Sequence, residues 1–227
     1  MDEKTRSRNR PEPRVLFGIE SPFTADYLDT LVRLEIEVAA RILSDPPTWS
    51  LRGIPIVLNP EDITFLLLDL PVVLCSVTPK RREEAHRRAI SLGFKRFSSV
   101  IDPTAIVPDG IYAGQGLFIN ANATFGAEVE LDDFVTVNRA ASVGHHTVIE
   151  AFATVGPGAT LASHCRIGKR VMIGAGAVVA PSARIGEGAT VAAGAVVFRD
   201  VEAGATVIGN PARVSKQAND EPISASP

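Results

Sequence analysis

The residues best suited to acid–base chemistry at neutral pH gather in one short part of the sequence. His145 and His146 interrupt the stretch NRAASVGHHTVI, which otherwise consists mostly of small and aliphatic residues, and His164 follows soon after. An unperturbed histidine side chain titrates near pH 6.5, so it can take a proton from an amine or a hydroxyl near neutral pH. His145 is therefore a candidate general base for a group-transfer reaction.

Composition places the chain among ordinary globular proteins. It has 227 residues, of which 45% are hydrophobic and 22% charged. The net charge of −3 leaves no basic surface for nucleic acid, so we expect no nucleic-acid partner. The 2 cysteines, Cys75 and Cys165, lack the spacing of a metal site or a disulfide framework. We expect both to be small buried residues in a reducing compartment.

The ends of the chain predict a cytoplasmic protein. The first residues, MDEKTRSRNRPEPR, lack the apolar core of a secretory signal. Nowhere does an apolar run approach the ~18 residues that span a bilayer, so no membrane partner is expected. Residues 1–13 are expected to be a disordered tail, and residues 210–227 an exit segment followed by a second disordered tail.

Residues 14–100 alternate between strand and helix patterns. Strands are predicted at 14–19, 54–58 and 71–77, and helices at 24–43 and 78–94. Thr24 is the predicted N-cap of the first helix, while the second helix begins with Thr78 and Pro79 and stops at Gly93. This alternation predicts a Rossmann-like α/β domain with a parallel sheet.

Residues 101–209 repeat with a period of six. The last residues of the successive hexapeptides are Val107, Ala113, Ile119, Phe125, Leu131, Val137, Val143, Ile149, Val155, Leu161, Ile167, Ile173, Val179, Ile185, Val191 and Val197. The residue two places earlier is mostly small or β-branched, and a glycine often follows the aliphatic residue. A chain that turns after every short strand forms a three-sided coil of 18 residues, and such coils stack ~4.8 Å apart. The repeat predicts an all-β parallel β-helix.

This region resembles the left-handed β-helix acyltransferases, which are typically trimers that use acyl-CoA. The resemblance is closer to the branch of sialic-acid O-acetyltransferases and nucleotide-amino-sugar N-acetyltransferases, whose members carry a small Rossmann-like domain before the β-helix. It rests on the segments VVLCSVTPKRREEAHRRAISLGFKRFSSVIDPTAIV, NRAASVGHHTVIEAFATVGPGATLASHCRIG and VIGNPARV. Together the resemblance covers residues 14–214.

The resemblance implies a role for individual residues. His145 matches the family's general base, Asn138 matches the asparagine beside the acceptor, and the backbone N–H of Ser163 matches the oxyanion donor. Gly18 matches the remaining glycine of the turn that receives the nucleotide phosphates. The residues that match the lining of the pantetheine arm of acetyl-CoA are Thr154, Ser163, Ala175 and Ala193.

The sequence also departs from the pattern of that branch. His146 stands where an acidic residue usually follows the catalytic histidine, Ser163 where glycine is usual, and Thr154 where histidine is frequent. The first turn, GIESPFT, keeps only Gly18, and Glu20 would repel a phosphate. Because the first turn is altered in this way, the acyl-transfer step is better supported than the nucleotide-linked acceptor.

The 18-residue coil places Glu128, His146 and His164 at the same position of three successive coils, next to the column of His145 and Ser163. Our hypothesis is that Glu128 holds His146, and that this pair partly replaces the missing acidic neighbour of His145.

The function predicted from these features is transfer of an acetyl group from acetyl-CoA to a nucleotide-linked amino sugar. A sugar or sialic-acid O-acetyltransferase is the nearest alternative. A zinc β-helix resembling the carbonic anhydrases is another, since His146 and His164 would stack ~4.8 Å apart near His145; no third histidine stands at a suitable coil separation, and no metal is expected. A third alternative is a non-catalytic trimeric scaffold.

A homotrimer is implied by the resemblance. We expect its subunits to meet through small residues on an outward face of the β-helix. The candidates are Ala153, Ala159, Ala177 and Ala195.

Overall fold

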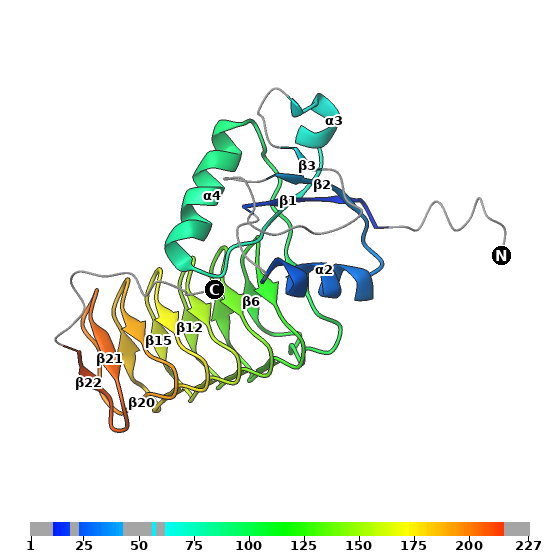
Figure 1. Ribbon diagram of the computed structural model, residues 1–227. Coiled ribbons are helices and arrows are strands. Elements are labelled where there is room, and N and C mark those ends of the chain that lie inside the picture. The colour runs from blue at the N-terminus through cyan, green and yellow to red at the C-terminus, as the bar shows by residue number, and fades with distance from the viewer. Residues whose placement is uncertain (1–10, 19–22, 43–55, 58–61, 216–227) are drawn as a thin grey trace.

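The computed structural model describes residues 11–18, 23–42, 56–57 and 62–215. Most of the two predicted tails therefore lies outside the described residues. Figure 1 shows an N-terminal unit of helices and strands above one end of a long β-helix. Among the described residues, no helix combines the length and the apolarity needed to cross a membrane.

The N-terminal unit contains a four-stranded parallel sheet. Its strands are β1 (Arg14–Phe17), β2 (Val38–Ile42), β3 (Ile56–Val57) and β4 (Val72–Leu74), in the spatial order β3-β2-β1-β4. Its helices are α2 (Thr24–Arg33), α3 (Phe65–Leu68) and α4 (Pro79–Ser91). Parallel pairs β1–β2, β1–β4 and β2–β3 confirm the predicted parallel sheet.

The helix predicted over residues 24–43 is wrong in its second half. The helix α2 ends at Arg33, the chain reverses at Glu35 with φ of 55°, and strand β2 follows. Pairing β2 beside β1 satisfies the backbone of both strands and buries Ala40, which outweighs the helical spacing of the apolar residues. The N-cap of α2 is Phe23, and Thr24 lies buried in the first turn.

The helix predicted over residues 78–94 is confirmed. Helix α4 has Thr78 at the N-cap and Pro79 as its first residue, where a missing N–H costs nothing. Gly93 follows the helix with φ of +101°. Helices often end at a residue with positive φ, and glycine adopts this conformation most readily. The Thr78 hydroxyl makes no capping hydrogen bond, so the extended backbone at this residue starts the helix without it.

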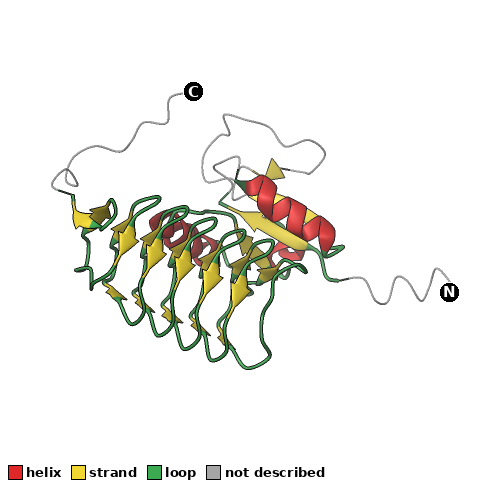
Figure 2. Cartoon of the chain, turned by 90° about the horizontal axis from the view of Figure 1, so that it is seen from below, coloured by secondary structure: helices red, strands yellow, loops and turns green. Residues whose placement is uncertain are grey.

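The β-helix has three faces, each made of two- or three-residue strands (Figure 2). The first face consists of β5 (Val100–Ile101), β7 (Phe118–Ile119), β10 (Thr136–Val137), β13 (Thr154–Val155), β16 (Met172–Ile173), β19 (Thr190–Val191), β21 (Thr206–Ile208) and β22 (Arg213–Val214). The second face consists of β8 (Thr124–Phe125), β11 (Ser142–Val143), β14 (Thr160–Leu161), β17 (Val178–Val179) and β20 (Val196–Val197). The third face consists of β6 (Tyr112–Ala113), β9 (Glu130–Leu131), β12 (Val148–Ile149), β15 (Arg166–Ile167) and β18 (Arg184–Ile185).

Strand pairing confirms the 18-residue coil. Thr136 pairs with Thr154 on the first face and Ser142 pairs with Thr160 on the second, both in parallel. The aliphatic residue at the end of each hexapeptide points inward and is buried from Ile119 to Val197, whereas Ala113 is exposed at the open end. The parallel β-helix predicted from the repeat is the fold of this region.

The expected outward alanine face is wrong. Ala153, Ala159, Ala177 and Ala195 are 0% exposed within a single chain and belong to the core of the β-helix. Each stands two residues before an inward aliphatic residue, and side chains two apart on a strand point to the same side. Small residues at these positions fill the narrow interior rather than a subunit contact.

We call the turns between faces corners: in the central coil, residues 138–141 form the first corner, 144–147 the second and 150–153 the third. At each corner one residue has a left-handed backbone, including Glu128, His146 and His164 with φ of 59°, 59° and 61°. The glycine that follows the aliphatic residue serves another purpose. A β-carbon on Gly144 would lie 2.6 Å from the backbone nitrogen of Ser163, so only glycine lets the coils stack there.

Arg82 joins the N-terminal unit to the β-helix. Its side chain is 1% exposed, and burial lowers its pKa to about 10. The guanidinium donates hydrogen bonds to the carbonyl oxygens of Phe134 (2.8 Å), Ser76 (2.7 Å), Val77 (3.1 Å), Phe152 (2.7 Å) and Ala153 (3.0 Å), and to the hydroxyl of Thr154 (3.0 Å). Because these acceptors come from both parts of the chain, a single side chain fixes how α4 lies on the coils.

Aromatic contacts complete this junction. Tyr27 of α2 stacks on Phe118 of β7 with ring centroids 3.8 Å apart. At the third corner, Phe134 and Phe152 stack 5.0 Å apart, and His86 of α4 lies 4.3 Å from the Phe134 ring. Burial among these rings lowers the pKa of His86.

Candidate active site

Most of the site residues expected from the sequence lie at or beside two different corners of the β-helix. At the first corner, beside α2, a cleft of about 430 Å³ contains Asn138, Thr154 and Ala175. Its remaining lining residues are Phe23, Asp26, Val77, Arg139, Gly156, Pro157 and Met172. Both the N-terminal unit and the coils therefore contribute to its wall.

The carboxamide of Asn138 is held firmly within this cleft. Its Oδ1 accepts hydrogen bonds from Nδ2 of Asn120, at 2.9 Å, and from the backbone N–H of Arg139, at 2.8 Å. In the part of the chain that the structure describes, Nδ2 of Asn138 has no acceptor. The amide can therefore donate a hydrogen bond to a ligand without losing one to the protein.

Two neighbours of Asn138 were missed by the sequence analysis. Asn120 stands one coil earlier, so a search for polar residues at the 18-residue period would find it. Asp26 comes from α2; it accepts a hydrogen bond from Asn120 at 3.2 Å and forms an ion pair with Arg139. No spacing in the sequence relates Asp26 to the first corner, because packing of α2 on the first face places it there.

Thr154, expected along the pantetheine arm, has its hydroxyl committed to the protein. It donates to the carbonyl oxygen of Val77 at 2.8 Å and accepts from Arg82, and the residue is 0% exposed. By contrast, Ala175 and Ala193 are exposed on successive coils at the first corner. Neither of their N–H groups has an acceptor among the described residues, so both can bind an extended ligand.

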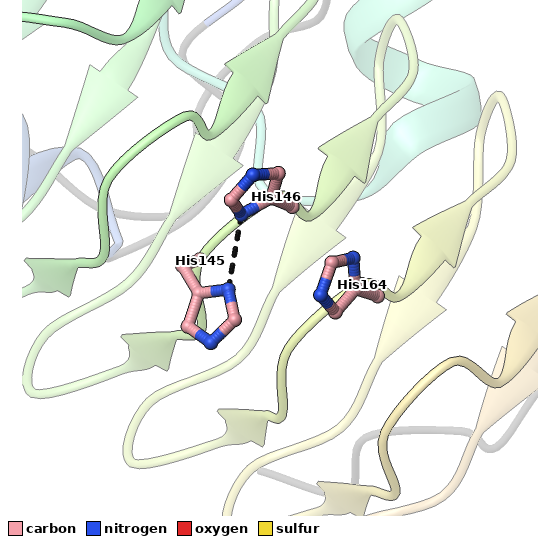
Figure 3. Close-up of side chains that lie close together, drawn as sticks. All are labelled: His145, His146 and His164. Carbon is pink, nitrogen blue, oxygen red and sulfur yellow. Dashed lines mark hydrogen bonds between the residues drawn. The ribbon is translucent and has the colours of Figure 1, made fainter.

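At the second corner three exposed histidines come together (Figure 3). The Nδ1 atoms of His145 and His146 lie 3.0 Å apart at hydrogen-bond distance. The rings of His146 and His164 stack with centroids 4.8 Å apart, and those of His145 and His164 lie 5.1 Å apart. One ring nitrogen from each histidine falls within 4.8 Å of the others.

Ser163 lies one coil after His145 in the same column, as the 18-residue period predicts. The coils are joined here by the backbone N–H of His164, which donates to the carbonyl oxygen of His145 at 2.9 Å. Among the described residues the N–H of Ser163 has no acceptor, and the same holds for the N–H of His145. The backbone N–H of Ser163, the donor expected for the oxyanion, is thus available to a ligand.

Glu128 occupies the coil position that the sequence gives it, but without the contact we hypothesised. In the described structure it forms neither a hydrogen bond nor an ion pair with His146. The His146 ring instead lies at hydrogen-bond distance from the ring of His145.

A single chain does not bring Asn138 to His145. The turn of Asn138 joins β10 to β11, and the turn of His145 joins β11 to β12, so the second face lies between them. The cleft at the first corner accordingly has neither His145 nor Ser163 in its wall.

Gly18, expected near a nucleotide phosphate, ends strand β1 against α4. It has φ of +77°, and a β-carbon here would lie 3.1 Å from Cβ of Ala85. Glycine is thus needed for the close approach of the helix, whatever else it binds. Glu20, expected to repel a phosphate, lies outside the described residues.

Comparisons with known proteins agree with the fold and its repeat. The family model for the bacterial transferase hexapeptide (six repeats) matches residues 164–199. No curated protein sequence matches the chain.

Several solved structures match nearly the whole chain. GDP-perosamine N-acetyltransferase from Caulobacter crescentus, solved with CoA and GDP-perosamine as a variant in which alanine replaces a histidine, is 27% identical; the match covers 89% of this chain and 96% of that one with a TM-score of 0.80. The acetyltransferase domain of PglB from Neisseria gonorrhoeae, solved with acetyl coenzyme A, is 29% identical and covers 90% and 100% of the two chains with a TM-score of 0.77. WeeI from Acinetobacter baumannii shares the fold at 24% identity, with a TM-score of 0.71 over 89% and 99% of the two chains.

Proposed function

We propose that the protein transfers an acetyl group from acetyl-CoA to the amino group of a nucleotide-linked sugar. The observation that carries this proposal is the match over 89% of the chain to an N-acetyltransferase that binds CoA and GDP-perosamine. The match includes the N-terminal unit, so it extends beyond the shared β-helix.

In this reaction His145 acts as the general base. When its Nδ1–H donates to Nδ1 of His146, 3.0 Å away, the lone pair of its Nε2 is left free. Nε2 takes a proton from the acceptor nitrogen as that nitrogen bonds to the thioester carbon. The carbon–sulfur bond then breaks, and the CoA thiolate recovers a proton from the imidazolium.

His146 takes the place of the carboxylate that usually follows the base in similar proteins. A neutral imidazole acceptor fixes the tautomer and the ring orientation of His145, but it adds no negative charge beside the imidazolium. The backbone N–H of Ser163 supports the negative oxygen that develops on the thioester carbonyl.

A homotrimer would unite the two corners. Since Asn138 and His145 stand at different corners of one chain, we place the reacting groups between subunits, with the cleft of Asn138 facing His145 of the next subunit. The exposed N–H groups of Ala175 and Ala193 would line the pantetheine arm of acetyl-CoA, with Ser163 at its reactive end and Thr154 as a buried support.

The N-terminal unit, residues 14–100, is proposed to be a Rossmann-like domain that binds the acceptor near Gly18. Residues 101–209 form the transferase unit, followed by the exit segment that contains β22. In parallel sheets flanked by helices, ligands bind beyond the carboxyl ends of the strands, which is where Gly18 stands after β1.

The test is acetyl-CoA consumption with a panel of nucleotide-linked amino sugars, free amino sugars and sialic acids. We expect turnover with a nucleotide-linked amino sugar, and a loss of about 100-fold or more in kcat for His145→Ala. His164→Ala is the matched control, because it removes an equally exposed histidine from the same corner. Failure of the whole panel, or a His145→Ala variant as active as His164→Ala, would reject the assignment.

A further inference from the structure

We propose that His145, His146 and His164 bind one transition-metal ion of the Zn²⁺ class per chain, and that this ion inhibits acetyl transfer. The site shares His145 with the proposed acetyl-transfer site. It consists of three imidazoles from two successive coils at the second corner (Figure 3).

The geometry of the three rings suits such an ion. Imidazole nitrogens bind Zn²⁺ at about 2.0–2.1 Å, so two ligands of a tetrahedral ion lie about 3.3 Å apart. The Nδ1 atoms of His145 and His146 are already 3.0 Å apart, and a nitrogen of each of the three rings lies within 4.8 Å of the others. The third ring must therefore move by only about 1–2 Å to complete the set.

The backbone at the corner can hold this arrangement while the side chains adjust. His146 and His164 occupy the same left-handed position of adjacent coils, with φ of 59° and 61°. The His164 N–H donates to the His145 carbonyl oxygen at 2.9 Å and ties these two coils together. The His146 N–H donates to the Ala127 carbonyl oxygen at 3.0 Å and ties its coil to the preceding one. Binding thus needs rotation of exposed rings and no change of fold.

The ring chemistry also favours a metal of this class. Neutral imidazole is a ligand for Zn²⁺, Ni²⁺, Cu²⁺ and Co²⁺, whereas Mg²⁺ and Ca²⁺ prefer oxygen ligands. On a single chain all three rings are exposed, so the protein leaves the fourth position of the ion open for water.

Inhibition follows from the tautomer that the metal imposes on His145, and this step rests on the proposed function. An ion on Nδ1 of a neutral imidazole leaves the ring proton on Nε2. His145 then has no lone pair with which to accept a proton from the acceptor amine. The metal-bound protein should therefore bind acetyl-CoA but turn over slowly.

The experiment titrates the chelator-treated full-length protein with Zn²⁺ alone by calorimetry and with Co²⁺ alone by visible absorption. We expect one ion per chain and a Co²⁺ spectrum typical of a four-coordinate ion with three nitrogen ligands and one water. His146→Ala and His164→Ala should each weaken binding by about tenfold or more. Glu128→Gln, at the same position one coil earlier, is the matched control and should bind as the parent does.

Equal metal affinity in the parent and in both histidine variants would overturn the proposal, as would a stoichiometry far below one ion per chain. These measurements need no substrate, so they are independent of the acetyl-transfer assay. If acetyl transfer is observed, the Zn²⁺ concentration that halves its rate should be at least tenfold lower for the parent than for His164→Ala. Equal suppression would reject the inhibitory role while leaving the enzyme assignment intact.

Discussion

Asn138 and His145 belong to the same coil of the β-helix, yet they stand at two different corners with the second face between them. The cleft that contains Asn138 has no atom of His145 in its wall. Two residues that the sequence presents as one motif are thus separated by the fold, and a neighbouring subunit is the simplest means of uniting their chemistry.

Mixed trimers test this arrangement. If Asn138 of one subunit works with His145 of the next, co-refolding the inactive variants Asn138→Ala and His145→Ala in equal amounts should restore about a quarter of parental activity. Three quarters of random trimers contain both variants, and each of these has one complete site out of three. If both residues act from one chain, the mixture stays as inactive as the separate variants.

The contact between His145 and His146 predicts a graded effect at position 146. His146→Ala removes the acceptor of the Nδ1 proton, so kcat should fall roughly tenfold with little change in KM. His146→Asp restores an acceptor and adds a negative charge, so its kcat should equal or exceed that of the parent. Steady-state kinetics with both substrates measure this; an alanine variant with parental kcat would contradict the role of His146.

Arg82 predicts a strong dependence of stability on one side chain. Arg82→Met leaves several buried carbonyl oxygens without a donor, so the free energy of unfolding should fall by about 3 kcal/mol or more. Arg88→Met, an exposed position on the same helix, should change it by less than about 0.5 kcal/mol. Chemical denaturation at fixed protein concentration compares the two, and equal losses would count against the buried network.

The packing of His86 predicts a loss of stability in mild acid. Burial lowers the pKa of His86 below the ordinary histidine value of 6.5 in the folded protein. Between the folded pKa and 6.5 the unfolded chain binds the extra proton, so stability rises with pH there and falls as the pH drops from 6.5. Melting temperatures at pH 7.5 and 5.5 measure this difference.

His86→Phe should shrink the difference between the two melting temperatures, because phenylalanine keeps the aromatic contacts and cannot be protonated. His164→Phe, at an exposed histidine, is the control and should leave the difference unchanged. The same pH effect in the parent and in His86→Phe would show that another group is responsible.

The β-helix could be predicted because its information is local. Each hexapeptide carries its own inward residue, so the register of a coil follows by counting, and the columns of His145 and of His146 are correct for that reason. The predicted outward direction of the alanine side chains was wrong, although it concerns the same local pattern. Ala153 and Ala177 obey the two-residue alternation of strands, which overrides the outward position expected for them.

The features that the sequence did not predict depend on contacts between segments far apart in the chain. Helical spacing continues beyond Arg33, but pairing of β2 with β1 decides the conformation there. Asp26 and Arg82 reach the coils from helices of the N-terminal unit, and nothing in their local sequence indicates those partners. The sequence therefore predicted only those residues of the first-corner cleft that belong to the β-helix.

The left-handed corner residue has a wider meaning for how this surface can change. Glutamate, histidine, phenylalanine, alanine and arginine all occupy it with nearly the same φ, at Glu128, His146, Phe152, Ala140 and Arg170. Since the backbone accepts such different side chains at one conformation, single substitutions at a corner can change its chemistry without disturbing the core of the β-helix. The row of left-handed positions can therefore present many different combinations of side chains on the same backbone, and His146 with His164 is one such combination.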